Sequence, residues 1–349
     1  MNAVTDRSAW RPEDMETDRS WSFSLTDDMV TDLERALDGV RDMPFGAITR
    51  EDFPLPSMAD VLGGLIAEIQ DGRGLAMLSG MPTDHDYPDL ERIYWGLGTH
   101  LGTGVTQNVE TGLIHYITDG ELAPKDGARM LGKPRPSKLH VDLSDVVGLF
   151  CVKQAPDSPK SLVASSMTVY NEIRANHPEY LETLELGYYW NRKGPEGDEK
   201  PHSEFRVPAW SEANGVVSCR FHAGWIRGGH KQADEPLTER DDEIFAYIDE
   251  VSVANAYAFD LKEGDIAFWN NYTTFHGRDG FAEQDEESRK RVLLRLWLDF
   301  DDIRPFADEG RVRYGAVRHG QMGWTAAEIL DGKNSSPHAR DAEGVPLVE

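Results

Sequence analysis

Residues 291–298 read RVLLRLWL, a short apolar run typical of a β-strand, in which both arginines fall at odd positions and every even position is aliphatic. Because successive side chains of a strand point to opposite faces, the odd positions, with Arg291 and Arg295, share one face and four aliphatic residues share the other. The aliphatic face is expected to pack against another layer. If the opposite face lines an interior, its two arginines need partners, because burying an unpaired charge is costly. A bound carboxylate is one solution, and an edge strand with arginines in solvent is the alternative.

Several other short strand-like runs follow residue 138, separated by Gly, Pro, Asp and Asn turns, and this spacing predicts an antiparallel β-sandwich or barrel. They lie in residues 138–156, 205–210, 215–225, 256–261 and 264–270. The first third of the chain instead shows helical stripes, near 26–40, 57–70 and 88–100, around one short strand at 74–80; further helices are expected at 167–184 and 232–253. We therefore expect a mainly β domain with flanking helices over residues 21–331. Residues 1–20 are expected to form an N-terminal arm, either loose or ordered by contact with the rest of the chain, and residues 332–349 a polar C-terminal tail.

Composition narrows the class of partner. The formal net charge of −26 would repel a phosphate backbone, so nucleic acid is not an expected partner. No apolar run has the length of a membrane span or the character of a secretory signal, so a cytoplasmic protein is expected, without a membrane partner. Cys151 and Cys219 lie in apolar runs and are interpreted as buried free thiols. The sequence is compatible with either a monomer or a homo-oligomer.

Two stretches carry candidate metal ligands. In LHVD (139–142), His140 and Asp142 share one face of a predicted strand, and in FWNNYTTFHGRDGF (268–281), His276 follows a late predicted strand. Two histidines and one carboxylate form the facial triad of non-haem Fe(II) oxygenases. Each motif alone also fits a simpler interpretation: His140 and Asp142 could form a surface hydrogen-bonded pair, and His276 could be a core or loop histidine.

These motifs together resemble the Fe(II)/2-oxoglutarate-dependent dioxygenases of the taurine dioxygenase (TauD/TfdA) family. Blocks at 50–56, 72–82, 92–108, 138–156 and 264–281, with RKRVLLRLWL (289–298), carry the resemblance over most of the chain. It implies a double-stranded β-helix, or jelly roll, with flanking helices. It also implies that the iron ligands are His140, Asp142 and His276. The carboxylate at position 142 argues against a halogenase, in which a small residue replaces it.

The resemblance further implies where 2-oxoglutarate binds. Arg291 matches the arginine that binds its distal carboxylate, and Arg295 matches a second carboxylate contact, to cosubstrate or substrate. Ser161 stands where the family often has a threonine that hydrogen-bonds 2-oxoglutarate, although the glycines usual before it are missing here. The pair His222-Ala223 stands where a more basic pattern is expected.

The implied activity is oxidation of a small polar molecule, carboxylate- or amino-acid-like, by hydroxylation, desaturation or related C–H oxidation. Fe(II), 2-oxoglutarate and O2 are the expected cofactor and cosubstrates, with succinate and CO2 released. Candidate substrate contacts are Gln107, Asn108, Asn271 and Arg278, each of which could instead be a turn or structural residue. Two alternatives stay open: a metal-dependent β-barrel enzyme that does not use 2-oxoglutarate, and a catalytically silent barrel that binds a carboxylate.

Overall fold

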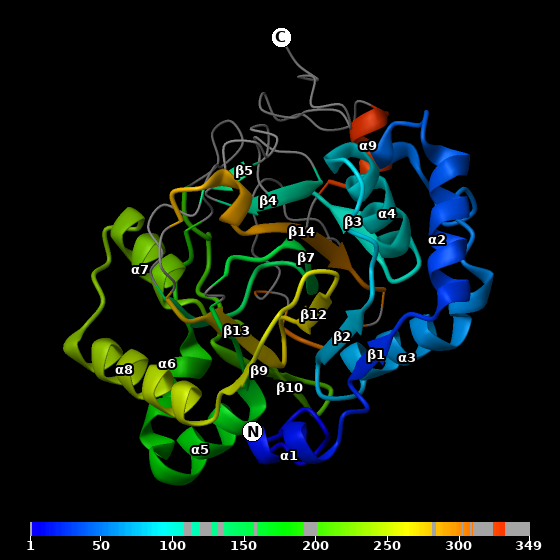
Figure 1. The fold of residues 1–349 in the computed structure, drawn as a ribbon. Helices are drawn as coiled ribbons and strands as arrows, with labels where there is room; N and C mark the ends of the chain where they lie inside the picture. Colours follow the sequence, from blue (N-terminus) through cyan, green and yellow to red (C-terminus); the bar gives the residue numbers. More distant parts are fainter. Residues whose placement is uncertain are drawn as a thin grey trace.

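Two open β-sheets face each other in the computed structural model and form a jelly-roll core with helices on both sides (Figure 1). The structure describes residues 2–107, 113–118, 128–130, 136–156, 159–191, 201–280, 284–301, 303–307, 309 and 324–331. The large sheet has the order β1-β2-β12-β7-β14-β4-β5, with β3 also paired to β14. The small sheet has the order β11-β8-β13-β6, and β9 and β10 form a separate hairpin. The mainly β fold with flanking helices is as predicted, although the sheets do not close into a barrel.

The bounds of the elements are as follows. The strands are β1 Ser22–Ser24, β2 Leu75–Ser79, β3 Thr103–Val105, β4 Ile114–Thr118, β5 Ala128–Met130, β6 Ser137–His140, β7 Val146–Lys153, β8 Ser161–Ser165, β9 Trp210–Ala213, β10 Val216–Cys219, β11 Tyr257–Phe259, β12 Ile266–Asn270, β13 Thr274–Arg278 and β14 Val292–Asp299. The helices are α1 Pro12–Thr17, α2 Asp27–Val40, α3 Ala59–Gln70, α4 Tyr87–Thr99, α5 Ser166–Asn176, α6 Leu181–Leu186, α7 Ala223–Gln232, α8 Glu239–Ala254 and α9 Ala326–Leu330.

Strand β14 has the two faces that its alternation predicts, and it lies between β7 and β4 in the large sheet. Its even-numbered aliphatic side chains are buried against the layer formed by α2, α3 and α4. Gly98 of α4 permits a close approach, because a Cβ there would lie 2.5 Å from Leu296 Cδ2. Arg291, which directly precedes β14, and the odd-numbered Leu293 and Arg295 line a cavity between the two sheets. The edge-strand alternative is therefore excluded.

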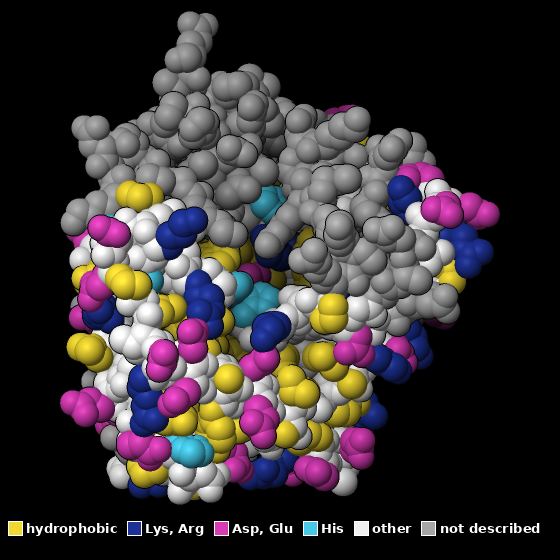
Figure 2. Space-filling view, turned by 90° about the vertical axis from the view of Figure 1, so that its left-hand side faces the viewer, with side chains coloured by type: hydrophobic (Ala, Val, Ile, Leu, Met, Phe, Trp, Pro, Cys, Tyr) yellow, Lys and Arg dark blue, Asp and Glu magenta, His cyan; other side chains and the backbone are white. Residues whose placement is uncertain are grey.

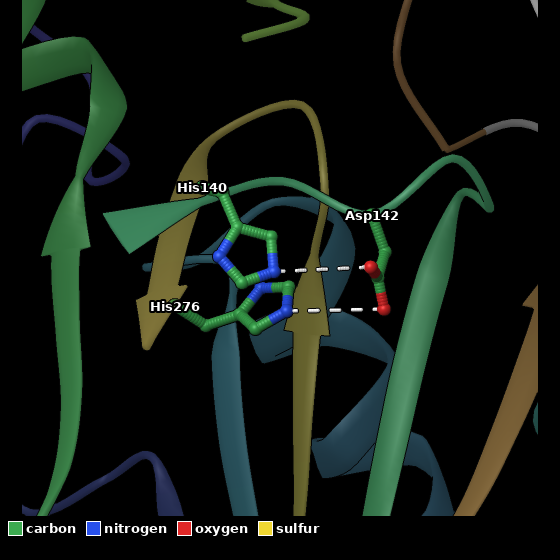
Figure 3. A group of neighbouring side chains, drawn as sticks. All are labelled: His140, Asp142 and His276. Atoms are coloured by element: carbon green, nitrogen blue, oxygen red, sulfur yellow. Dashed lines mark ion pairs between the residues drawn. The ribbon is translucent and has the colours of Figure 1, made fainter. Parts of the chain in front are cut away.

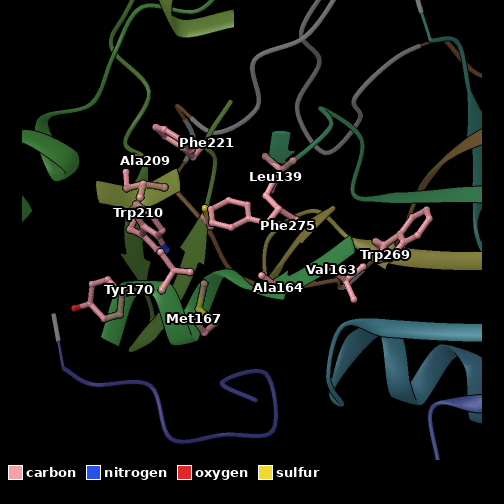
Figure 4. Packing of buried hydrophobic residues seen from close by; sticks show 14 of the residues in the cluster. Leu139, Val163, Ala164, Met167, Tyr170, Ala209, Trp210, Phe221, Trp269 and Phe275 are labelled. Atoms are coloured by element: carbon pink, nitrogen blue, oxygen red, sulfur yellow. The ribbon is translucent and has the colours of Figure 1, made fainter. Parts of the chain in front are cut away.

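Besides the apolar cluster between the large sheet and α2, α3 and α4, a second hydrophobic core lies between the two sheets and extends to α5, α7 and α8 (Figure 4). Phe275 of β13 lies near its centre, with its ring 6.2 Å from that of Trp210 and 6.3 Å from that of Phe221, centroid to centroid. Burial of each large apolar side chain contributes about 1.5–3 kcal/mol. This packing fixes β13 and β6 relative to each other, and these strands carry the two candidate histidine ligands.

Residues 2–20 differ from the loose arm that their polar composition suggested. They contain α1, and the side chains of Trp10 and Met15 are buried in the inter-sheet core. Trp10 Nε1 donates to the carbonyl of Arg73 at 2.8 Å, and Ser165 Oγ donates to the carbonyl of Ser8. A few large apolar residues thus anchor a segment whose average composition is polar. The expected C-terminal tail, 332–349, lies outside the described residues.

Helix α7 also corrects an expectation. The run 215–225 was predicted to be one strand, but the strand ends at Cys219 and α7 begins at Ala223. His222 caps this helix, since its Nδ1 accepts from the backbone N–H of Trp225 at 3.3 Å. Likewise, the helix expected over 167–184 is divided, with α5 ending at Asn176. In the described part of the chain, no helix is both long and apolar enough to cross a membrane.

Candidate metal centre

Strands β6 and β13 bring the three predicted ligands together (Figure 3). His140 ends β6 and is the register partner of His276 on β13, while Asp142 follows His140 by two residues. His140 Nε2 lies 3.9 Å from Asp142 Oδ1, and His276 Nε2 lies 3.9 Å from Asp142 Oδ2. The candidate ligand atoms all lie within 4.8 Å of one another. Two atoms that each bind one metal ion at about 2.1 Å lie about 3–4 Å apart, so small side-chain movements would let these three groups hold a single ion.

The protonation of both imidazoles also suits a metal. His140 Nδ1 lies 2.6 Å from the carbonyl oxygen of Lys138, which places the proton on Nδ1 and leaves Nε2 as the donor atom. His276 stacks on Trp269 with ring centroids 5.3 Å apart. Burial, reinforced by His140, lowers the pKa of His276 to about 3, so its imidazole is neutral at neutral pH. Neutral imidazole is the form that binds metals.

Asn271 fixes the backbone of the loop that carries Asp142 through two hydrogen bonds. Asn271 Oδ1 accepts from the backbone N–H of Asp142 at 2.9 Å, and its Nδ2 donates to the carbonyl of Ser144 at 3.1 Å. Arg220 Nη1 donates to the carbonyl of Asp142 at 3.0 Å. Asn271 is fully buried and lies outside the lining of the cavity, so its predicted role as a substrate contact is replaced by a structural one. Sequence could not show this, because the contact joins segments far apart in the chain.

A cavity of about 810 Å³ opens beside the three candidate ligands. Figure 2 shows the same region from outside as a hollow that contains histidine side chains, with lysine and arginine side chains beside it. Its walls combine the two sheets with α7 and α8, which contribute apolar residues such as Phe245 and Ile248. The cavity is large enough to hold two small molecules beside a metal ion.

Arg291 and Ser161, the two residues expected to contact 2-oxoglutarate, both line this cavity. Arg291 is 3% exposed, and among the described residues its Nε has no hydrogen-bond partner. Burial, together with the charge of Arg278, lowers the pKa of Arg291 to about 10, and the guanidinium is still charged at neutral pH. A buried cation with an unsatisfied donor fits a carboxylate ligand.

Arg295 also lines the cavity but is already engaged with protein groups. Its Nη1 donates to Asp142 Oδ2 at 3.1 Å, and its Nε donates to Gln107 Oε1 at 2.6 Å. This differs from the expected contact with a cosubstrate or substrate carboxylate. Gln107 is fully buried, does not line the cavity and donates to the carbonyls of Leu113 and Arg295, which contradicts its assignment as a substrate contact.

The two remaining candidates have different outcomes. Arg278 lines the cavity, with Nη1 donating to the carbonyl of Asp279 at 2.9 Å, and burial lowers its pKa. Asn108 lies outside the described residues. The sequence singled out His222 without assigning it a role; it caps α7, and its ring lies 4.6 Å from that of His140, centroid to centroid. Trp269 was missed, because an aromatic residue in an apolar run is equally typical of a core.

A jelly roll with two imidazoles and one carboxylate beside a basic cavity defines the non-haem iron dioxygenases as a class. The model of the family described as "Taurine catabolism dioxygenase TauD, TfdA family" matches residues 37–297, and the chain belongs to this family. The protein is thus a non-haem iron dioxygenase, and Fe(II), with 2-oxoglutarate and O2, is the cofactor set, as predicted from the sequence.

Curated relatives extend over most of the chain. The chain is 27% identical over 317 residues to FR-33289 synthase of Streptomyces rubellomurinus, covering 87% of this chain and 92% of the relative. It is 28% identical over 315 residues to the taurine hydroxylase-like protein SAT17 of Stachybotrys chartarum, covering 86% of this chain and 80% of that relative.

Solved structures share the fold at low identity. An asparagine oxygenase in complex with Fe(II), 2S,3S-3-hydroxyasparagine and succinate matches with a TM-score of 0.60, 15% identity and coverage of 85% of this chain and 99% of that chain. The non-haem iron oxygenase OrfP in complex with Fe and alpha-ketoglutaric acid matches with a TM-score of 0.53 and 14% identity, covering 79% of this chain and 93% of that chain.

Proposed function

We propose that the protein oxidises a C–H bond of a small polar molecule, carboxylate- or amino-acid-like, and that His140, Asp142 and His276 hold the iron. One observation carries this proposal: two imidazole nitrogens each lie 3.9 Å from an oxygen of the same carboxylate, at the wall of a cavity that also holds a buried arginine. The iron, when bound with 2-oxoglutarate and O2, supplies the oxidising power, and succinate and CO2 are released. Hydroxylation is the simplest outcome, and desaturation is the related one.

The side chains of this chain bind and orient the reactants. Arg291 and Ser161 are proposed to bind the distal carboxylate of 2-oxoglutarate, since both line the cavity and the guanidinium is buried and charged. The backbone carbonyl of Lys138 holds His140 in one tautomer. The apolar wall formed by Phe221 and Phe245 excludes water from the reacting centre.

The substrate class is proposed from solved structures of similar fold and from one cavity residue of this chain. The solved structures of similar fold include complexes with 3-hydroxyasparagine and 3-hydroxyarginine, which are amino acids oxidised at carbon. In this chain, Arg278 lies on the cavity wall and is proposed to meet a polar substrate group. We further propose that residues 21–331 form one catalytic domain and that the protein works in the cytoplasm. Its two buried free cysteines support a reducing compartment.

An anaerobic binding experiment tests the iron and 2-oxoglutarate assignment. Fe(II) and 2-oxoglutarate added to the purified protein are expected to give a visible metal-to-ligand charge-transfer band. The band should vanish in His276→Ala and persist in His85→Ala, a matched control, because His85 instead contacts Glu34 near the surface. A wild-type protein that binds Fe(II) without the band would be a metal enzyme that does not use 2-oxoglutarate. A protein that binds neither would be the silent barrel. Succinate release against a panel of amino acids then identifies the substrate.

A further inference from the structure

The carboxylate of Asp142 is held by two donors from β14. Its Oδ2 accepts from Arg295 Nη1 at 3.1 Å and from Trp297 Nε1 at 3.2 Å. These donors are two residues apart on one strand, so both side chains point to the same face of the sheet. All three residues are buried, and Asp142 is only 4% exposed. Water therefore competes little with these hydrogen bonds.

Gln107 in turn fixes the guanidinium of Arg295. Its Oε1 accepts from Arg295 Nε at 2.6 Å, and its Nε2 donates to the carbonyl of Arg295 at 2.6 Å and to that of Leu113 at 3.1 Å. Arg295 Nη2 also lies 3.4 Å from His115 Nδ1. Gln107 is fully buried and, unlike Arg295, does not line the cavity, so its described contacts are with protein groups.

Arg291 lines the same cavity as Arg295, but the two arginines differ in their hydrogen-bond partners. Arg291 Nε has no hydrogen-bond partner among the residues that the structure describes, whereas Arg295 has protein partners on Nε and Nη1. A carboxylate ligand entering the cavity would find an unsatisfied donor on Arg291. At Arg295 it would have to compete with Asp142 for the same guanidinium.

We infer that Arg295, fixed by Gln107 and assisted by Trp297, is a positioning residue for the metal ligand Asp142. The guanidinium compensates the charge of the carboxylate and fixes its plane. Partners of this kind orient a ligand and tune its affinity for the metal. The inference rests on the proposed iron site, because it concerns the affinity of that site for a metal.

Co(II) binding to the metal-free protein is the test, read by calorimetry and by the visible d–d bands of bound Co(II). Gln107→Met, Trp297→Phe and Arg295→Lys are each expected to weaken Co(II) binding about 10-fold or more. They should also change the d–d spectrum at saturating Co(II), because the carboxylate adopts a different orientation. The control is Arg73→Lys, which alters another buried arginine paired with a carboxylate, Glu68, at 2.8 Å. It should lower the melting temperature while leaving Co(II) affinity within twofold and the spectrum unchanged.

The outcomes separate the two proposals. A wild-type protein that fails to bind Co(II) would refute the proposed metal site itself. If the wild type binds Co(II), and Gln107→Met and Trp297→Phe bind it with unchanged affinity and spectrum, the positioning role is wrong. An Arg295→Lys variant that raises only the KM for 2-oxoglutarate would likewise assign Arg295 to the cosubstrate. If Arg295→Lys does not fold, the other two variants decide, since Trp297→Phe keeps the aromatic packing and Gln107→Met keeps the side-chain length.

Discussion

Replacing Arg291 by methionine is expected to stabilise the ligand-free protein and to abolish its stabilisation by 2-oxoglutarate. The guanidinium is 3% exposed, and among the described residues its Nε has no hydrogen-bond partner. Its pKa falls from 12.5 to about 10, with burial as the main cause. Since one pKa unit corresponds to about 1.4 kcal/mol, burial raises the free energy of the charged group by about 3 kcal/mol.

Methionine removes that cost while keeping an unbranched, flexible chain that fills the same space. The free energy of unfolding of the ligand-free protein should therefore rise by about 1–3 kcal/mol, as when other buried charges are replaced by apolar residues. The same change removes the partner of the distal carboxylate. Truncating one side of a buried charge pair costs about 2–5 kcal/mol, so the Kd for 2-oxoglutarate should rise at least about 30-fold.

Thermal unfolding with Co(II), with and without 2-oxoglutarate, measures both effects at once. At a concentration of 100 times the wild-type Kd, the ligand stabilises the wild type by about 2.7 kcal/mol, and a 30-fold weaker variant by only about 0.9 kcal/mol. Arg291→Lys is the matched control, because it keeps the charge and loses the bidentate fork. It should respond weakly to 2-oxoglutarate without gaining stability. An Arg291→Met protein that is less stable than the wild type, yet responds fully to 2-oxoglutarate, would refute this reasoning.

Two further predictions concern the core and the loop that carries Asp142. Burial raises the pKa of Cys151 to about 12 and that of Cys219 well above its usual value, so iodoacetamide at pH 8 should label neither thiol until the protein is unfolded. Rapid labelling of the folded protein at pH 8 would contradict the burial of these thiols. Because the thiols of the unfolded chain lose their protons at a lower pH than those of the folded protein, the free energy of unfolding should fall as the pH rises above about 9. Asn271→Leu leaves the Asp142 N–H and the Ser144 carbonyl unpaired and should cost about 2–4 kcal/mol in urea unfolding. Lost activity with unchanged stability would instead make Asn271 a substrate contact.

The chemistry of the site could be read from the sequence because it depends on local spacing. The i, i+2 relation in LHVD places two candidate ligands on one side, and the alternation in RVLLRLWL assigns each side chain of β14 to a face. Both relations are properties of an extended backbone and need no tertiary information. The charge of the chain and the absence of long apolar runs are likewise properties of the sequence alone.

The sequence was least informative where residues distant along the chain meet. Gln107 and Asn271 looked like substrate contacts because polar residues next to a predicted site are ambiguous. In the folded protein both are buried, and each hydrogen-bonds a group that lies more than a hundred residues away: Arg295 for Gln107 and Asp142 for Asn271. The N-terminal segment differs from a loose arm for the same reason, since the side chain of Trp10 is buried in the inter-sheet core and its Nε1 donates to the carbonyl of Arg73.

The sequence by itself therefore determined the strand faces, the three candidate ligands and the presence of two arginines on one strand face. Only the tertiary structure decided that these arginines differ. Arg295 meets Asp142 and Gln107, while Arg291 keeps an Nε without a partner among the described residues. The physical reason is that alternation sets the direction of a side chain, whereas its hydrogen-bond partners depend on which other strands and loops the fold places opposite it.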